Sequence, residues 1–185
     1  MSAAHARPAP DPALAARAQR LTPGNDGEPD AAAEQLRNFL YDYGHCLDDD
    51  RLEDWPAFFA ENGSYRIIPR ENLDRGMTFA LMFLENRNQL RDRVLVIRKA
   101  LVYAPRMYCH LIGSIRCRQG ADSGRFDLRA SCAVYATDIV EGTSKLFAAG
   151  RYDGQVAANA DGLQFTRLDL ILDTSSVDRQ MPIPL

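Results

Sequence analysis

The chain has 185 residues, a length that suits one domain with a single core, because a chain of this size buries about 70% of its unfolded surface. Its 22 basic and 25 acidic residues give a formal net charge of −3, and the basic side chains are scattered among the acidic ones. Nucleic acids and anionic membrane surfaces need a concentrated positive face, so the composition argues against both as partners.

The sequence also argues against a membrane span and a secretory signal. The longest apolar candidate, residues 77–84, is about half the roughly 18 residues that a transmembrane helix needs. Residues 1–20 contain Ala and Arg but no continuous apolar segment of the kind found in secretory signals. The four cysteines form no CxxC pair, and we interpret them as reduced thiols. We therefore expect a cytoplasmic protein.

Residues 1–30 are rich in Ala, Pro, Gly and Asp and contain almost no large apolar side chain after Leu21. Such a segment buries too little surface to offset the entropy that it loses on ordering. We therefore predict a flexible N-terminal arm over residues 1–30 and a single α+β domain over residues 31–185.

The first strong pattern is helical and covers residues 31–46. Apolar side chains recur there at the spacing that lines one face of a helix. They are Leu36, Phe39, Leu40, Tyr43 and Leu47. Asp50 and Glu53 resemble a capping box for a second helix, which Pro56 makes short or broken. A third helix is predicted over residues 87–101, where apolar residues again have helical spacing.

Two strands are predicted between the second and third helices. Asn62-Gly63 predicts a turn before a strand over residues 64–68. Residues 71–76 (ENLDRG) resemble another turn, and residues 77–84 are continuously apolar. Such a run fits either a buried strand or a helical turn, and the preceding turn favours the strand.

The last third of the chain changes to the period of strands. Alternating apolar residues predict strands over residues 107–117, 126–134 and 146–152, followed by a final strand over residues 163–172. Turn residues separate these runs, which predicts an antiparallel meander. In the final strand the apolar positions change phase, which predicts a bulge near Thr166. Helices followed by sequential strands are typical of an α+β fold in which a curved antiparallel sheet packs around the helices.

The sequence offers few metal ligands and no nucleotide motif. His45 and Cys46 are adjacent on a predicted helix, so their side chains diverge by about 100° and are poorly placed to share one ion. Cys109 and His110 are neighbours on a predicted strand and point to opposite faces. The sequence contains none of the patterns GxGxxG, GxxxxGK[ST], GxSxG and CxH…CxxH. We therefore predict no catalytic, cofactor-binding or metal-binding residue in this chain.

One acid–base arrangement is still compatible with the pattern. In a cone with a helix-lined mouth, Tyr43, Asp48 or Asp49, and His110 can converge on a pocket. Alternatively, His110 hydrogen-bonds to a backbone group inside the sheet, and the aspartates at residues 48–50 form a solvated helix end. We favour this second interpretation.

Five segments in this order resemble the small, or beta, subunits of aromatic-ring-hydroxylating oxygenases. They are WPAFFAENGSYRIIPREN (55–72), LRDRVLVIRKALVYAP (90–105), YCHLIG (108–113), LFAAGRY (146–152) and MPIPL (181–185). The resemblance covers about residues 34–185. Within that family, the sequence is most similar to small subunits of enzymes that act on benzoate-type acids such as salicylate, anthranilate or terephthalate.

The resemblance implies a cystatin-like cone, shared with scytalone dehydratase and nuclear transport factor 2. It implies a large alpha subunit that carries a Rieske [2Fe–2S] cluster and a mononuclear non-haem iron, supplied with electrons from NAD(P)H through a reductase or ferredoxin. The present chain is then a structural subunit without a cofactor, usually in an α3β3 hexamer. Two alternatives stay open: a stand-alone dehydratase or isomerase of the same fold, and a small-molecule binding protein with the cone as its pocket.

We expect the small subunits to form a trimer through the curved sheet and residues 181–185. Tyr135 and Phe147 lie opposite apolar neighbours in their strands, so both faces carry bulky groups, more than a single core needs. The apolar segment at residues 181–185 is exposed unless a neighbouring subunit or the chain's own core covers it.

Overall fold

The computed structural model describes residues 31–77, 79–100, 105–120, 122–160, 162–174 and 183–185. The predicted arm at residues 1–30 lies outside these. The first described helix, α2, spans Ala31–Asp48 and buries the apolar face that its spacing predicts. It ends at Asp48, slightly beyond the predicted end at Cys46.

Six strands form one sheet in the order β2-β1-β6-β5-β4-β3. Their bounds are Phe59–Pro69 for β1, Met82–Leu84 for β2, Arg106–Gln119 for β3, Arg125–Asp138 for β4, Ser144–Asn159 for β5 and Gly162–Leu172 for β6. Strands β3 to β6 make the predicted antiparallel meander. Strand β1 joins the sheet parallel to β6. Pairing between strands so distant in the chain leaves no local signal, and the sequence did not predict it.

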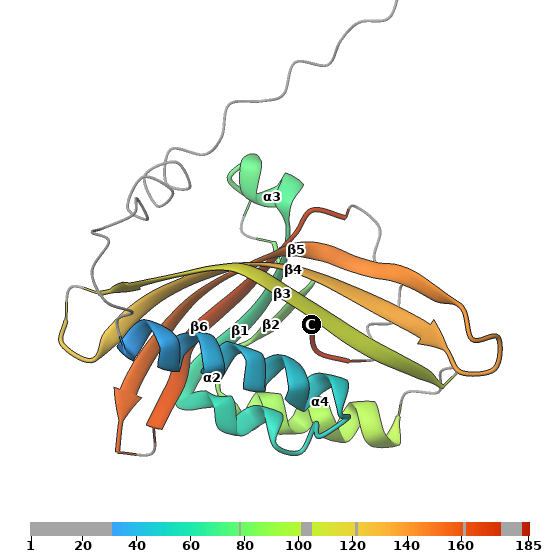
Figure 1. Ribbon diagram of the computed structural model, residues 1–185, viewed down its shortest axis with the longest axis horizontal. Coiled ribbons are helices and arrows are strands. Elements are labelled where there is room, and N and C mark those ends of the chain that lie inside the picture. The colour runs from blue at the N-terminus through green and yellow to red at the C-terminus, as the bar shows by residue number, and fades with distance from the viewer. Residues whose placement is uncertain (1–30, 78, 101–104, 121, 161, 175–182) are drawn as a thin grey trace, which may run out of the picture.

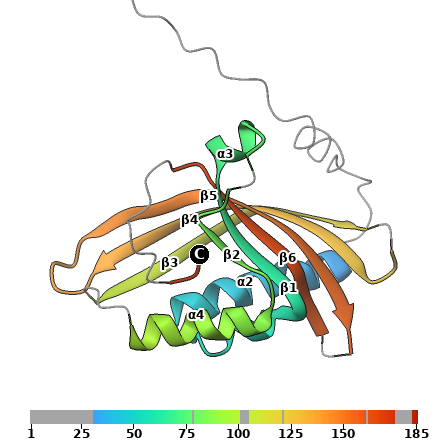
Figure 2. The same ribbon diagram turned by 180° about the vertical axis from the view of Figure 1, so that it is seen from behind.

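The sheet is strongly curved, and helices α2 and α4 lie on its concave side (Figures 1 and 2). Helix α4 spans Arg87–Lys99, within the predicted 87–101, and residues 101–104 lie outside the described part. The side chain of Asn86 accepts a hydrogen bond from the Gln89 amide and caps its first turn. None of the described helices has the length and apolar character needed to cross a membrane.

The core lies between the concave face and the two helices. Its largest members are aromatic, and their rings meet mostly edge to face. Those that are fully buried are Tyr43, Trp55, Phe59, Tyr65, Tyr152 and Phe165. The predicted α+β class, with helices on a curved antiparallel sheet, is confirmed.

The predicted bulge in the last strand is also confirmed. Gln155 pairs with Arg167 and the following residue, Val156, pairs with Phe165, so Thr166 is left without a partner across the ladder. The Thr166 hydroxyl donates to the carbonyl of Gln155 at 3.3 Å. This extra residue shifts the phase of β6, and Phe165 and Leu168 both face the core as a result.

The predicted capping box is wrong. Asp50 and Glu53 do not cap a helix but accept hydrogen bonds from the Arg98 guanidinium at 2.7 and 2.8 Å. The helical segment that follows is the short 3-10 turn η1, Trp55–Phe58, with Pro56 in its first turn. The two carboxylates are therefore oriented by their ion pairs with Arg98, which lies on α4.

The predicted turn at Asn62-Gly63 is wrong as well, because both residues lie inside β1. The pairing of β1 with β6 shifts register between Phe59 and Ser64, so the chain makes a bulge there instead of a turn. A Cβ at Gly63 would lie 2.5 Å from the carbonyl oxygen of Phe165. This close approach of two backbones explains the glycine.

The segment before α4 also differs from its prediction. The expected turn at residues 71–76 is mostly the short helix α3, Arg70–Asp74. The expected buried strand at residues 77–84 is reduced to β2 at the edge of the sheet, and residue 78 lies outside the described part. Phe79 and Phe83 are exposed by 68% and 52%. A continuous apolar run indicates burial only if other residues cover it, and among the described residues of this run only Met82 and Leu84 pack against the core.

Candidate functional site

Asp48 and His110 form a close pair at the edge of the concave face. Asp48 ends α2, and His110 lies on the inner side of β3, which passes under that helix. The His110 Nδ1 atom lies 2.5 Å from Asp48 Oδ1, and the His110 backbone N–H donates to both carboxylate oxygens at 3.0 and 2.9 Å. The interpretation that His110 bonds to a backbone group is therefore wrong. So is a solvated Asp48, although Asp49 and Asp50 are exposed as expected.

This pair is closed to solvent on its histidine side. The His110 side chain has no exposed surface, and the Asp48 side chain is 19% exposed. The Nε2 atom of His110 is buried and has no hydrogen-bond partner among the described residues. Tyr43 does not complete an acid–base set, since its hydroxyl donates to the backbone oxygen of Leu185 at 3.1 Å. A general base must reach its substrate, so the geometry favours a positioning role for His110.

The described residues contain no cluster of three His, Cys, Asp or Glu side chains that fits a metal ion. All four cysteines are free. Burial raises the pKa of the Cys46 thiol to about 11 and that of Cys132 to about 12. Thiols with such pKa values are poor nucleophiles and ligands near neutral pH.

A row of charged side chains crosses the outer face of the sheet from strand to strand. Paired positions across five strands carry Arg66, Asp169, Asp153, Arg129 and Arg116. We call this set the charged row. Asp169 and Asp153 are almost completely buried, although they lie on the convex side.

The buried carboxylates of the charged row are held by arginines. The guanidinium of Arg66 binds both oxygens of Asp169 at 2.7 Å, a bidentate geometry. Arg167 also binds Asp169, and it donates to Asp153 at 2.7 Å. The hydrogen bonds that Arg66 donates to Asp169 raise the pKa of Arg66. Sequence reasoning missed this network, for which the only signal was the charged residues between leucines in β6.

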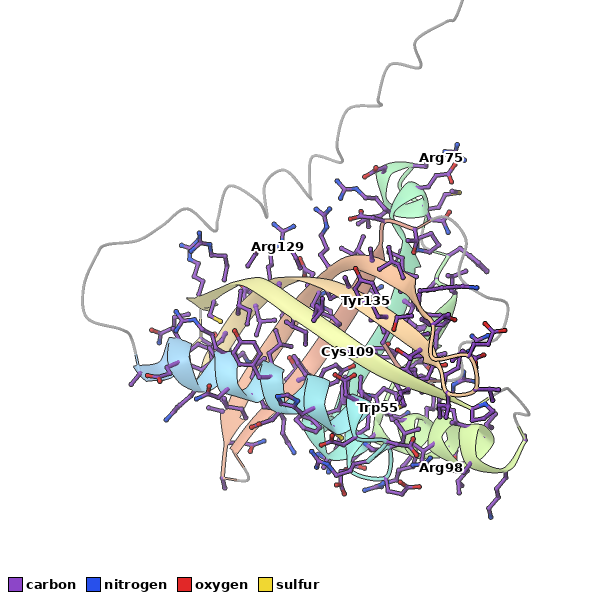
Figure 3. All side chains as sticks on the ribbon, turned by 45° about the vertical axis from the view of Figure 1, so that its right-hand side comes forward. Trp55, Arg75, Arg98, Cys109, Arg129 and Tyr135 are labelled. Atoms are coloured by element: carbon purple, nitrogen blue, oxygen red, sulfur yellow. The ribbon has the colours of Figure 1, made fainter. Side chains whose placement is uncertain are left out.

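Apolar side chains gather farther along the outer face, where β3, β4 and β5 approach the loop at residues 139–143. Cys109, Tyr135 and Leu146 are directly paired across three strands and all face outward. Figure 3 shows Cys109 and Tyr135 on these neighbouring strands, with Arg129 on the side away from the helices. The full set, which we call the outer patch, is Met107, Cys109, Leu111, Tyr135, Ile139, Val140 and Leu146.

The outer patch confirms one expected outward residue and corrects another. Tyr135 faces outward and is 38% exposed, as its position predicted. Phe147 faces inward and packs on Tyr108 with ring centroids 5.7 Å apart. Leu146 faces outward in its place. A register shift between Val134 and Tyr135 leaves Phe147 unpaired on β5, which reverses the alternation at this point.

Comparison with known proteins agrees with this architecture. Residues 44–179 match the family model for the ring hydroxylating beta subunit. The chain is 35% identical over 142 residues to the small subunit of anthranilate 1,2-dioxygenase from Burkholderia cepacia, covering 77% of this chain and 86% of that one. It is 31% identical to a protein from Novosphingobium aromaticivorans assigned as the beta subunit of an aromatic-ring-hydroxylating dioxygenase, with a TM-score of 0.76 over 84% and 97% of the two chains.

The chain therefore belongs to the beta-subunit family of ring-hydroxylating oxygenases. A protein assigned as a scytalone dehydratase, also from Novosphingobium aromaticivorans, is 15% identical with a TM-score of 0.60 over 78% of this chain and 85% of that one. At that identity the likeness concerns the fold alone, and it agrees with the predicted cone.

Proposed function

We propose that this chain is a non-catalytic small subunit of the terminal oxygenase component of an aromatic-ring-hydroxylating oxygenase acting on an aromatic carboxylate. Family membership carries the proposal. The substrate class rests on the similarity to an anthranilate dioxygenase subunit. The partner is a large alpha subunit with the Rieske cluster and the mononuclear iron, and NAD(P)H supplies electrons through a reductase.

Two features of the chain support a structural part in that assembly. His110 is sealed inside the domain, so it offers no group to a substrate from solvent. The outer patch exposes more apolar side chains than a face made for water needs, and on the same face the buried carboxylates of the charged row are held by arginines. We assign this outer face to contact between small subunits and with the large subunit, in an α3β3 hexamer.

The experiment is co-expression with a large subunit that contains the CxH…CxxH pattern, followed by measurement of mass and iron content and by product analysis on substituted benzoates. The expected result is a hexamer with all iron in the large subunit. Tyr135→Asp should disrupt it, because a charge then lies at the centre of the outer patch. Tyr41→Asp is the matched control, since Tyr41 is similarly exposed but lies on α2.

A chain that stays monomeric at tens of micromolar, and that never co-purifies with the large subunit, contradicts this proposal. A stand-alone dehydratase or isomerase is then the alternative, because Asp48 and His110 form the kind of pair that acid–base chemistry uses. Under that alternative, the isolated chain has an activity that His110→Ala abolishes.

A further inference from the structure

Residues 183–185 lie inside the concave face, among groups that are distant in the sequence. In Figures 1 and 2 the C-terminal end of the chain is drawn between the sheet and helix α4. Ile183 is 4% exposed and Leu185 has no exposed surface. Both belong to the same core cluster as the aromatic residues of η1 and β1. The expectation that the end of the chain serves the trimer contact is therefore corrected for Ile183 and Leu185, because the chain's own core covers them.

Two buried hydroxyl groups meet the backbone of Leu185, and a buried indole supports one of them. The Tyr65 hydroxyl donates to the Leu185 oxygen at 2.9 Å and accepts from the Leu185 N–H at 2.9 Å. The Tyr43 hydroxyl donates to the same oxygen at 3.1 Å. The Trp55 indole N–H lies 3.4 Å from the Tyr43 hydroxyl and donates to it. One residue thus satisfies the hydrogen-bonding capacity of a prearranged set of side chains.

The two phenols are fixed as hydrogen-bond donors. Tyr43 and Tyr65 are completely buried, and burial raises the pKa of each well above its usual value. A phenol that stays protonated donates to an oxygen lone pair, and an anionic oxygen is its strongest acceptor. The wall around the donors is aromatic, since the Trp55 and Tyr65 rings meet edge to face at 5.3 Å. The enclosure therefore combines donors for an acid with an apolar wall.

The groups that form this enclosure come from elements that do not include residues 183–185. Tyr43 is held by α2, Trp55 by η1 and Tyr65 by β1, and these pack on one another through aromatic contacts. Leu185 contributes an apolar side chain, an acceptor oxygen and an N–H donor, all within one small unit. Recognition sites for small molecules have this composition, with apolar walls and a few polar groups that set orientation.

We propose that this enclosure is a binding site for small apolar acids that carry an N–H donor beside their carboxylate, and that residues 183–185 occupy it in place of such a ligand. N-acyl amino acids and 2-aminobenzoate have this chemistry. The ligand's carboxylate takes the place of the Leu185 oxygen, and its N–H faces the Tyr65 hydroxyl. Every group involved lies within one chain, so the proposal does not depend on the oxygenase assembly.

The test uses the chain with residues 183–185 deleted, compared with the complete chain. N-acetyl-L-leucine, 2-aminobenzoate and, as a cationic control of similar size, cyclohexylamine are titrated by calorimetry and by thermal unfolding. The deleted chain should bind both acids at least about tenfold more tightly than the complete chain, and its melting temperature should rise with ligand concentration. Cyclohexylamine should bind neither protein.

Two tyrosine variants of the deleted chain distinguish specific binding through the Tyr65 hydroxyl from non-specific filling of the space that the deletion leaves. Tyr65→Phe removes the hydroxyl that meets Leu185 and should weaken binding of the acids about tenfold, the usual scale for a hydrogen bond to a charged group. Tyr152→Phe is the matched control, because that tyrosine is equally buried but is not among the groups bonded to Leu185. It should leave binding within about twofold of the parent.

Three results overturn the proposal: no gain in affinity on deletion, equal effects of the two tyrosine variants, or equal binding of cyclohexylamine. If the deleted chain does not fold alone, circular dichroism decides the question. A ligand that binds only the folded state restores folding by mass action, so N-acetyl-L-leucine at about 10 mM should recover the helical signal. A chain that stays unfolded under that condition also overturns it.

Discussion

The two faces of the long strands are built from alternate residues of the same segments, yet they are completed in different ways. On the inner face, Val134 and Tyr152 are fully buried and belong to the core cluster that also contains residues of α2, Ile183 and Leu185. On the outer face, Tyr135 and Leu146 are exposed, while Asp169 is buried among arginines. The apolar residues of the inner face are buried by other parts of the same chain. The outer face carries apolar groups that no described residue covers.

This difference separates what the chain needs in order to fold from what it needs in order to assemble. Inward residues decide the free energy of unfolding of the isolated subunit, since their burial drives folding. Outward residues of the outer patch should add little to that free energy, and in the proposed assembly a partner subunit buries them. Substitutions on adjacent positions of one strand should therefore have separate effects.

The largest effect is expected at Val134. Val134→Asp places a carboxylate in an apolar core without a partner, and it should lower the free energy of unfolding by at least about 4 kcal/mol. Tyr135→Asp, at the next residue, should lower it by less than about 1 kcal/mol in the isolated chain. Urea unfolding followed by circular dichroism measures both, and similar losses at the two positions would sink the distinction between the faces.

Alkaline pH should destabilise the protein, because the buried tyrosines of the inner face resist ionisation in the folded state. Burial raises the pKa of Tyr43, Tyr65 and Tyr152 above the value of 10.0 that an unfolded tyrosine has. The folded state therefore holds these protons more tightly. The stability that they contribute is complete below about pH 10 and is lost as the pH rises above it.

Removing one of these tyrosines gives a quantitative check. Above about pH 10, Tyr152→Phe should reduce the fall in unfolding free energy by about 1.4 kcal/mol per pH unit, the slope of one proton. Denaturant titrations at several alkaline pH values measure that slope. An unchanged slope means that Tyr152 ionises in the folded state, contrary to the expected effect of its burial.

The contrast between the inner and outer faces also explains which parts of the structure could be predicted from the sequence. Inner residues at helical or alternating spacing predicted α2, α4, the meander and even the bulge at Thr166, because local periodicity records which side is buried. The parallel pairing of β1 with β6 was missed, since it joins distant segments. The contact of Asp50 with Arg98 was missed for the same reason. The approach of Asp48 to His110 was offered only as the less favoured alternative. A charged side chain can pair with any of several partners along the chain, and only the folded structure determines which partner lies within reach.

A smaller effect is expected in the charged row. Asp169→Asn removes the buried charge that Arg66 and Arg167 share, and it should lower the free energy of unfolding by about 2 kcal/mol, because Arg66 is partly exposed and solvent screens it. Asp173→Asn is the control. Its carboxylate binds Arg70 and Arg151 but is 43% exposed, so the loss should be below about 0.5 kcal/mol. Equal losses in urea titrations would show that the contribution of Asp169 to the free energy of unfolding does not depend on its burial.

The last prediction concerns the pair at the edge of the inner face. His110→Ala removes the partner of a carboxylate that is itself mostly buried, which should lower the free energy of unfolding by about 1 to 3 kcal/mol. His45→Ala, at an exposed position of α2, should have almost no effect. The Asp48 carboxylate also accepts the backbone N–H of His110, so Asp48→Asn should destabilise the chain through the joint between α2 and β3.

The His110→Ala variant also tests whether His110 serves as a catalytic base. Loss of a general base lowers turnover by about 10² to 10⁴-fold, whereas loss of a positioning contact reduces the amount of assembled complex and leaves the turnover of each complex close to normal. Turnover must therefore be expressed per iron-loaded complex, after separation of unassembled chains. Because the His110 side chain has no exposed surface and its Nε2 atom is buried, we expect normal turnover per complex. A loss of a hundredfold or more at full iron content, within the range of about 10² to 10⁴ for a base, would assign the chain a catalytic part.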